Sequence, residues 1–410
     1  MAVNFFVIGM TPEMPADGEA ARISAMLSAG VVDRFHIRHP WLSMAETRKL
    51  LQAVPAELHD RITLHDNYKL AEEFPGVGIH LNARNSFENP GCRGEVSRSC
   101  HTLKELDRAD EYSYVTLSPI YNSISKQGYK GAFKPGSSQL GRAIYGRSVM
   151  AMGGVTPSRF SELCSAGFSG AVMLGYIWDN DDASAAILRA RKQLHLRNFD
   201  FQFITDSPTV DGTVTQVMQA LEGYCKWIQI RMKEAPVSDI IAVIEKVMPE
   251  VRANDATLIV DDHVEIARDY DVAGVHLGHN DMPPSEAREI LGPGKVIGYT
   301  INTLEQAQSS EVEFADYFGV GPFNDTRTKK NLAPVLGAAG IKGIVDDLRQ
   351  RGIEAPVVAI GGIGRTDIKS ALKTGAAGVA VSGAITRAAD PAKEAAYFAM
   401  FNQLNNIFKK

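Results

Sequence analysis

Polar residues follow successive apolar segments in the second half of the chain, at spacings that suit anion binding. Gln229, Arg231 and Lys233 alternate at the end of the segment Trp227–Ile230, so an extended strand would place all three on one face. An arginine and a lysine that faced inward would be unfavourable to bury without an anionic partner. We therefore interpret these residues as ligand contacts; the alternative is a polar cluster on a surface loop.

Carboxylates follow the next two apolar segments. Asp261 and Asp262 come directly after Thr257–Val260, and Asp281 comes shortly after Gly274–Leu277. Magnesium in proteins is typically held by one or two carboxylates together with phosphate oxygens of the substrate. Aspartates beside two cations thus predict a Mg²⁺ that bridges to a diphosphate. The alternative is that Asp262 and Asp281 cap helix N-termini without any metal.

Hydroxyl groups and glycines later in the chain suit a second phosphate. Thr326 and Thr328 alternate just before Lys329, which makes either a phosphate cradle or an ordinary polar turn. Paired glycines let backbone N–H groups approach a ligand closely. The last two apolar segments end in Gly361-Gly362 and in Val381-Ser382-Gly383, where the loops of a barrel often hold a phosphate.

Short apolar segments rich in valine and isoleucine must position these residues. Eight occur in the second half: Phe201–Thr205, Trp227–Ile230, Thr257–Val260, Gly274–Leu277, Lys295–Tyr299, Tyr317–Gly321, Val357–Ile360 and Gly378–Val381. Helical patterns such as Ile240–Val247 and Ile341–Gln350 separate most of them, which predicts parallel strands connected by helices. Eight such units predict a (β/α)8 TIM barrel, whose active site lies at the C-terminal ends of the strands. A doubly wound open sheet is the alternative, but its glycine-rich first turn is missing.

The first half of the chain repeats the second in the same order. The matching segments are Phe35–Arg38 with Ile228–Arg231, Leu64–Asp66 with Val260–Asp262, Gly78–Leu81 with Gly274–Leu277, Ser99–Leu103 with Thr300–Leu304, Ser118–Ile120 with Gly321–Phe323, and Ala151–Val155 with Ala359–Ile363. Collinear repeats of this length predict two copies of one fold. We expect an α/β protein with two tandem TIM barrels, at residues 1–196 and 197–410.

The composition limits the classes of partner. The chain has 410 residues, 45% of them hydrophobic, and a formal net charge of −5, which suits two globular domains and disfavours nucleic acid. No apolar run is long enough to span a membrane. The four cysteines form no pair motif, which favours reduced thiols in a cytoplasmic protein. We expect small-molecule substrates, and the sequence leaves a homo-oligomer open.

The motifs of the second half resemble those of thiamin-phosphate synthase. They run in the order Gln-x-Arg-x-Lys, Asp-Asp, Gly-Val-His-Leu-Gly-x-x-Asp, Gly-Pro-Phe with Thr-x-Thr-Lys, and Ala-Ile-Gly-Gly-Ile. The resemblance implies an enzyme that joins hydroxymethylpyrimidine diphosphate to thiazole phosphate and releases pyrophosphate. It also implies a dissociative reaction through a pyrimidine-methyl cation, with Mg²⁺ as cofactor, bound by Asp262 and Asp281.

The resemblance further implies a role for each matching residue. The pyrimidine diphosphate would contact Gln229, Arg231, Lys233, Asp261, Thr300 and Lys329. The thiazole phosphate would contact Thr326, Thr328, Gly361, Gly362, Val381 and Ser382. Among the contacts to the pyrimidine diphosphate, Arg231, Lys233 and Lys329 would stabilise the charge that develops on pyrophosphate. Two positions depart from the family, because Asp261 replaces the usual asparagine and Thr300 the usual serine.

The first half resembles the thiazole tautomerase branch of the same superfamily. It carries His36-Ile37-Arg38 in place of Gln-x-Arg-x-Lys, and Arg98-Ser99-Cys100-His101 before the next helix. The resemblance implies a proton shift on a carboxylated thiazole phosphate, with His101 as acid and base. The implied ligand contacts are Arg38, Ser123, Ser125 and Lys126. The alternative is a degenerate copy kept for packing or binding, since Asn85 replaces the second metal carboxylate.

Two other functions fit parts of this pattern. One is another phosphate-binding barrel, such as an isomerase, which the paired aspartates and Thr-x-Thr-Lys disfavour. The other is a non-catalytic sensor or carrier of thiamin precursors. The intact polar set disfavours that second function for the second half: Arg231, Lys233, Asp262, Asp281 and Lys329.

Overall fold

The computed structural model describes residues 5–86, 91–122, 131–196, 199–325 and 334–408. The chain divides into two compact units, Met1–Leu194 and His195–Lys410. The boundary suggested by the sequence, after residue 196, lies two residues farther along, at the end of helix α7 (Ala183–Leu196).

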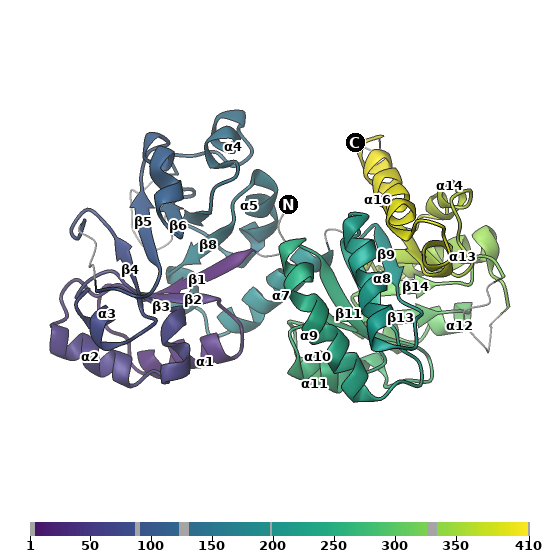
Figure 1. Cartoon of the computed structure of the whole chain (residues 1–410), viewed down its shortest axis with the longest axis horizontal. Helices are drawn as coiled ribbons and strands as arrows, with labels where there is room; N and C mark the ends of the chain where they lie inside the picture. The colour runs from purple at the N-terminus through teal and green to yellow at the C-terminus, as the bar shows by residue number, and fades with distance from the viewer. Residues whose placement is uncertain (1–4, 87–90, 123–130, 197–198, 326–333, 409–410) are drawn as a thin grey trace. The chain divides into compact units, whose positions relative to one another are not determined.

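The first unit is a closed barrel of eight parallel strands, paired in chain order with β8 against β1 (Figure 1). Its strands are β1 (Phe6–Met10), β2 (Arg34–Ile37), β3 (Ile62–Leu64), β4 (Gly78–Leu81), β5 (Val96–Cys100), β6 (Tyr114–Leu117), β7 (Val149–Met152) and β8 (Gly170–Met173). Its α-helices are α1 (Glu19–Ser28), α2 (Met44–Gln52), α3 (Leu70–Glu73), α4 (Ser138–Ile144), α5 (Phe160–Ala166), α6 (Gly175–Trp178) and α7, with 3-10 helices at Ala56–Arg61, Lys104–Glu111 and Pro157–Arg159.

The second unit is also a closed eight-stranded parallel barrel, with β16 against β9. Its strands are β9 (Phe201–Ile204), β10 (Trp227–Ile230), β11 (Thr257–Asp261), β12 (Gly274–Leu277), β13 (Val296–Ile301), β14 (Tyr317–Val320), β15 (Val357–Ile360) and β16 (Gly378–Val381). Its α-helices are α8 (Val210–Glu222), α9 (Val237–Ala253), α10 (Val264–Asp269), α11 (Pro284–Leu291), α12 (Leu304–Ala307), α13 (Gly337–Gln350), α14 (Ile368–Leu372), α15 (Gly383–Thr386) and α16 (Pro391–Phe408), with a 3-10 helix at Ser310–Phe314. The predicted fold class, two tandem TIM barrels, is confirmed.

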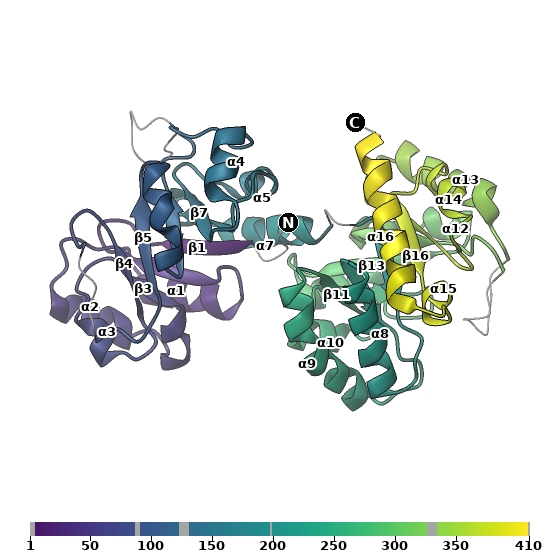
Figure 2. The same cartoon turned by 45° about the horizontal axis from the view of Figure 1, so that its top comes forward.

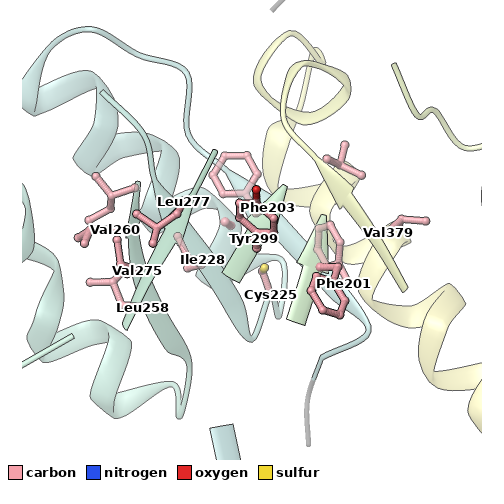
Figure 3. Close-up of a cluster of buried hydrophobic side chains, with 14 of the residues drawn as sticks. Phe201, Phe203, Cys225, Ile228, Leu258, Val260, Val275, Leu277, Tyr299 and Val379 are labelled. Carbon is pink, nitrogen blue, oxygen red and sulfur yellow. The ribbon is translucent and has the colours of Figure 1, made fainter. Parts of the chain in front are cut away.

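Side chains alternate along each strand of the second barrel between two packed layers. Phe201, Phe203 and Ile228 form one buried cluster with helix residues such as Val243 (Figure 3). The residues between them point the other way, and Trp227 packs with other strand residues inside the barrel. The period-two pattern therefore decides which polar side chains enter the barrel interior.

The helices cover the outer face with amphipathic surfaces. In α9, Ile240, Val243, Ile244 and Val247 recur at helical spacing and are all buried. Helices α8 and α16 lie side by side against the barrel (Figure 2). Within the described residues, no helix combines the length and apolar character needed to cross a bilayer.

Candidate active site in the second barrel

A chain of polar side chains crosses the interior of the second barrel at the C-terminal ends of its strands. The buried Gln229 donates from Nε2 to Asp261 Oδ1 at 2.5 Å, and Asp261 Oδ2 lies 3.3 Å from Arg231 Nε. The backbone N–H of Arg231 donates to Thr205 Oγ1 at 2.9 Å. Strands β10 and β11 thus bring three of the predicted ligand contacts together, and Asp261 orients both the amide and the guanidinium.

A second hydrogen-bonded group lies beside these side chains. His276 Nδ1 is 2.8 Å from the Tyr317 hydroxyl, and its Nε2 is 2.8 Å from Thr300 Oγ1. The Tyr317 hydroxyl also accepts from Gln202 Nε2 at 3.2 Å, and Gln202 Nε2 donates to Gln229 Oε1 at 2.9 Å. The predicted contact Thr300 is buried, and its hydroxyl bonds to His276.

The two predicted metal aspartates lie close together. The pKa of Asp262 is raised to about 7, first by burial and then by the carboxylates of Asp261 and Asp281, against the opposing charge of Lys233. Lys233 itself is exposed. A buried carboxyl group whose pKa is raised by neighbouring carboxylates lies in an arrangement that a divalent cation would neutralise.

Neither aspartate caps a helix. The N-cap residue of α10 is His263 and that of α11 is Pro283. Asp281 Oδ2 instead accepts a hydrogen bond from the backbone N–H of Gly278 at 2.6 Å, and Asp262 adopts a left-handed backbone with φ of 65°. A strained φ at a non-glycine residue needs surrounding structure to hold it, and such residues cluster at functional sites.

A cavity of about 660 Å³ opens beside Arg231 and its hydrogen-bonded neighbours. Five predicted site residues line it: Arg231, Gly361, Gly362, Val381 and Ser382. The φ values of Gly361 and Gly362 are 96° and 64°, and a Cβ added to Gly362 would lie 2.5 Å from the Asp325 carbonyl oxygen. Only glycine fits this turn, which leaves backbone N–H groups open to a ligand. The Ser382 hydroxyl is buried and has no hydrogen-bond partner within the described part of the chain.

Six predicted contacts lie outside the described residues. They are Thr326, Thr328 and Lys329 in the second barrel, and Ser123, Ser125 and Lys126 in the first.

Two further residues, Gln202 and Arg387, belong to the site and were not predicted from the sequence. Gln202 is a buried polar residue between Phe201 and Phe203, a signal that the strand pattern carried. Arg387 lines the cavity, with a guanidinium nitrogen 3.9 Å from Asp206 Oδ2. Its place after the last strand follows no motif, so only the structure could find it.

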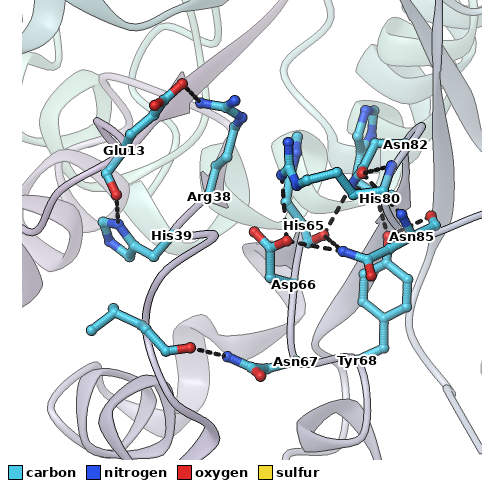
Figure 4. Close-up of polar contacts among 12 residues, drawn as sticks. Glu13, Arg38, His39, His65, Asp66, Asn67, Tyr68, His80, Asn82 and Asn85 are labelled. Carbon is cyan, nitrogen blue, oxygen red and sulfur yellow. Dashed lines mark hydrogen bonds and ion pairs between the residues drawn. The ribbon is translucent and has the colours of Figure 1, made fainter.

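The first barrel has a cavity of about 310 Å³ at the equivalent place. Its lining includes Arg38, His65, Ser99, His101, Met152, Gly153, Gly154 and Leu174. Arg38 pairs with Glu13 at 2.9 Å (Figure 4), and its backbone N–H donates to Thr11 Oγ1 at 2.8 Å, as that of Arg231 does to Thr205. His101 is exposed, with Nδ1 3.2 Å from Ser118 Oγ.

The carboxylate pair of the second barrel has no counterpart here. Asn85 occupies the repeat position of Asp281 and donates from Nδ2 to Asp66 Oδ1 at 2.9 Å (Figure 4). Arg84 approaches the same oxygen at 3.3 Å. Asp66 therefore faces an amide and a guanidinium instead of a second carboxylate.

Two closed (β/α)8 barrels, each with a glycine turn and an arginine at one cavity, define a tandem TIM-barrel protein. A family model described as thiamine monophosphate synthase matches residues 6–177 and 201–385, one match in each barrel. The chain belongs to this family.

Individual relatives match about half of the chain. A thiamine-phosphate synthase of Bacteroides thetaiotaomicron is 49% identical over 193 residues, which cover 47% of this chain and 92% of the relative. A thiamine-phosphate synthase of Methanosarcina barkeri is 34% identical over 210 residues, which cover 51% of this chain and 93% of the relative. A solved thiamine phosphate pyrophosphorylase from Pyrococcus furiosus is 35% identical with a TM-score of 0.45, covering 50% of this chain and 96% of that one.

Proposed function

We propose that the second barrel is a thiamin-phosphate synthase that joins hydroxymethylpyrimidine diphosphate to thiazole phosphate in thiamin biosynthesis. The observation that carries the proposal is the 660 Å³ cavity, which connects Arg231 to the glycine turn and to Ser382. A diphosphate at Arg231 and a phosphate at Gly361 and Gly362 would then share one enclosed space. The family match and the synthase relatives support this assignment.

The residues present fit a magnesium ion. Burial and neighbouring carboxylates raise the pKa of Asp262 to about 7, so a cation at Asp262 and Asp281 would relieve their repulsion. When bound, Mg²⁺ would neutralise negative charge on the diphosphate and on the departing pyrophosphate.

The chain's own cations would stabilise the leaving group. Departure of pyrophosphate breaks a carbon–oxygen bond and leaves both electrons on the oxygen, so negative charge grows there. Arg231, held by Asp261 and by Thr205, presents a fixed guanidinium to that charge. Lys233 lies at the same strand end, and Lys329 is the third proposed cation. This chemistry needs no strong general base.

Pyrophosphate release by the purified full chain tests the proposal. We expect release only when both substrates and Mg²⁺ are present. Asp262→Asn should lower the turnover number by about 10²–10³-fold, because a charge that holds the cation is lost. The matched variant Asp66→Asn changes the equivalent residue of the first barrel and should leave turnover unchanged. Substrate binding without turnover in the wild type would support a sensor or carrier instead.

For the first barrel we propose a thiazole tautomerase. The observation that favours it is the position of His101 at a cavity that also holds Arg38 and the Gly153-Gly154 turn. An imidazole at this place can remove a proton at one ligand atom and return it at another. Arg38 would pair with an anionic group of the ligand.

Isomerisation of the carboxylated thiazole phosphate, followed by ultraviolet absorbance, tests this assignment. His101→Asn should abolish the isomerisation and leave pyrophosphate release by the second barrel intact. A wild-type rate no higher than the uncatalysed rate would indicate a copy kept for packing or binding, and a catalysed rate that survives in His101→Asn would exclude His101 as the acid and base.

A further inference from the structure

Three histidines meet inside the first barrel. His36 on β2, His65 directly after β3 and His80 on β4 are all buried, and one ring nitrogen of each lies within 4.8 Å of the other two. His36 Nδ1 is 2.9 Å from His65 Nε2, and the rings of His65 and His80 stack with centroids 4.3 Å apart. Figure 4 shows His65 and His80 side by side beneath Asn82. No other group of three potential metal ligands meets the same distance criterion within the described residues.

The three imidazoles are in the protonation state that a metal ion requires. Burial, the largest cause in each case, lowers the pKa of His36 and His65 well below the ordinary value and that of His80 to about 3. All three are therefore neutral at physiological pH, and a neutral ring nitrogen is the form that binds a metal.

Outer hydrogen bonds orient two of the rings. Ser97 Oγ lies 2.8 Å from His80 Nδ1 and 3.3 Å from the Ile79 carbonyl oxygen. When the hydroxyl donates to that carbonyl it accepts from Nδ1, and this tautomer has its lone pair on Nε2. The other ring nitrogen of His36, Nε2, is 2.6 Å from the Tyr114 hydroxyl. Metal-binding histidines usually have such a partner on the second nitrogen.

The spacing suits a tetrahedral ion. Zinc–nitrogen bonds of about 2.0–2.1 Å place two ligating nitrogens roughly 3.3 Å apart in a tetrahedron. One pair now stands at 2.9 Å and no pair exceeds 4.8 Å, so small ring rotations would bring the three around one ion.

The cluster also borders the cavity of the first barrel. His65 lines that cavity, and so does Ser99, whose hydroxyl is 2.9 Å from His80 Nε2. The nearby cation Arg34 is paired with Glu95 at 2.7 Å, which reduces its repulsion toward a bound metal ion. A metal ion at these nitrogens would thus be accessible from the cavity side.

We propose that His36, His65 and His80 bind one divalent ion of the zinc type, with a fourth coordination position open to the cavity. Three histidines with one open position is the ligand set of many catalytic zinc sites. The equivalent residues of the second barrel are Gln229, Asp261 and His276, so this site belongs to the first barrel alone. It does not depend on the synthase activity.

Cobalt(II) titration of the tag-free full chain, stripped with chelator and held in excess Mg²⁺, tests the proposal. We expect one equivalent to give the strong visible absorption of a tetrahedral imidazole complex, which azide then shifts at the open position. Replacing either of two ligands, as in His65→Gln or His80→Gln, should abolish this absorption. His276→Gln, the matched change in the second barrel, should retain it. Far-ultraviolet circular dichroism and the thermal unfolding midpoint of each variant report whether the chain is folded.

Ser97→Ala decides the matter if the histidine variants do not fold. Loss of the outer hydrogen bond should weaken cobalt binding by about 10–100-fold. The proposal is overturned if the wild type gives no tetrahedral absorption, or if the absorption survives in His65→Gln. An azide-insensitive spectrum would overturn the open position. In each of these cases the synthase activity can still be present, so the two proposals fail separately.

Discussion

The two barrels share a frame and differ at a few inward positions. In both, a threonine after the first strand accepts a hydrogen bond from the backbone N–H of the site arginine. In both, paired glycines with the same two φ values, 96° and 64°, form the turn after the seventh strand. The ends of strands two to four, however, hold Gln229, Asp261 and His276 in one barrel and His36, His65 and His80 in the other. The two barrels thus have the same backbone frame and differ in the side chains that face the barrel interior, which is where a difference in function would arise.

Removal of the Arg231 guanidinium should have the largest effect on activity that is specific to the second barrel. We expect Arg231→Ala to lower the turnover number for pyrophosphate release by about 10²–10³-fold, because a fixed cation at the leaving group is lost. Arg231→Lys should recover only part of this, since lysine lacks the planar fork. Steady-state kinetics measures both. The control is Arg252→Ala, which removes a surface ion pair with Asp271. A normal turnover number in Arg231→Ala would mean that the reaction takes place at another site.

Acid should destabilise the first barrel through its histidines. His36, His65 and His80 have lowered pKa values in the folded chain, so below about pH 6.5 the unfolded state binds more protons than the native state. Stability should be complete above that pH and fall by about 1.4 kcal/mol per pH unit for each imidazole that stays neutral.

Hydrogen exchange read by mass spectrometry, corrected for intrinsic rates and recorded in chelator, reports each barrel of the full chain separately. His80→Gln should flatten the pH profile of the first barrel. Equal acid sensitivity in both barrels would show that the histidine cluster does not cause the difference.

The glycine turns should respond alike in stability and differently in activity. A Cβ would lie 2.5 Å from the Asp325 carbonyl oxygen at Gly362 and 2.1 Å from the Asn122 carbonyl oxygen at Gly154. With the added strain of a positive φ, each alanine substitution should cost about 1–3 kcal/mol of unfolding free energy. Denaturant titration measures this cost. Only Gly362→Ala should raise the KM for thiazole phosphate, and an unchanged KM would remove this turn from the binding site.

Asp262 should give the second barrel the opposite pH response. Its raised pKa means that the native state holds a proton that the unfolded state has released, so stability without Mg²⁺ should fall as pH rises from about 4 to about 7. Excess Mg²⁺ should reverse the trend, because the ion binds the ionised carboxylate. Thermal midpoints with and without Mg²⁺ test this, and Asp262→Asn should remove the difference.

The smallest effect is expected at Thr300. Thr300→Ser keeps the hydroxyl that bonds to His276 Nε2, so KM and the turnover number should change by no more than about twofold. Thr300→Val leaves a buried ring nitrogen without its partner and should cost about 1–3 kcal/mol of stability. A large kinetic defect in Thr300→Ser would mean that the threonine methyl group contacts the substrate.

Much of the fold followed from short apolar segments that alternate with helical patterns. Four of the eight strands predicted for the second barrel end at the residues the structure gives, and β13 alone extends two residues farther, to Ile301. The clustering of Arg231 with Asp261 followed from adjacent strands. Arg387 could not be predicted, because its approach to the cavity depends on how α15 turns after β16. Nor was the histidine cluster predicted, because His36, His65 and His80 belong to separate motifs, and their meeting depends on how the side chains at the ends of three adjacent strands are directed.

The different polar side chains inside the two barrels affect how a chain with two similar repeats folds correctly. Repeat proteins are prone to exchange equivalent segments during folding. A hybrid barrel that took β2 from the first repeat and β11 from the second would set His36 beside Asp261 and separate Gln229 from both of its partners. Such a hybrid would bury polar groups with mismatched hydrogen bonds, a penalty of about 1–3 kcal/mol each. The difference between the two interiors therefore favours correct assembly of each barrel, and this effect is separate from any role of the same side chains in ligand binding.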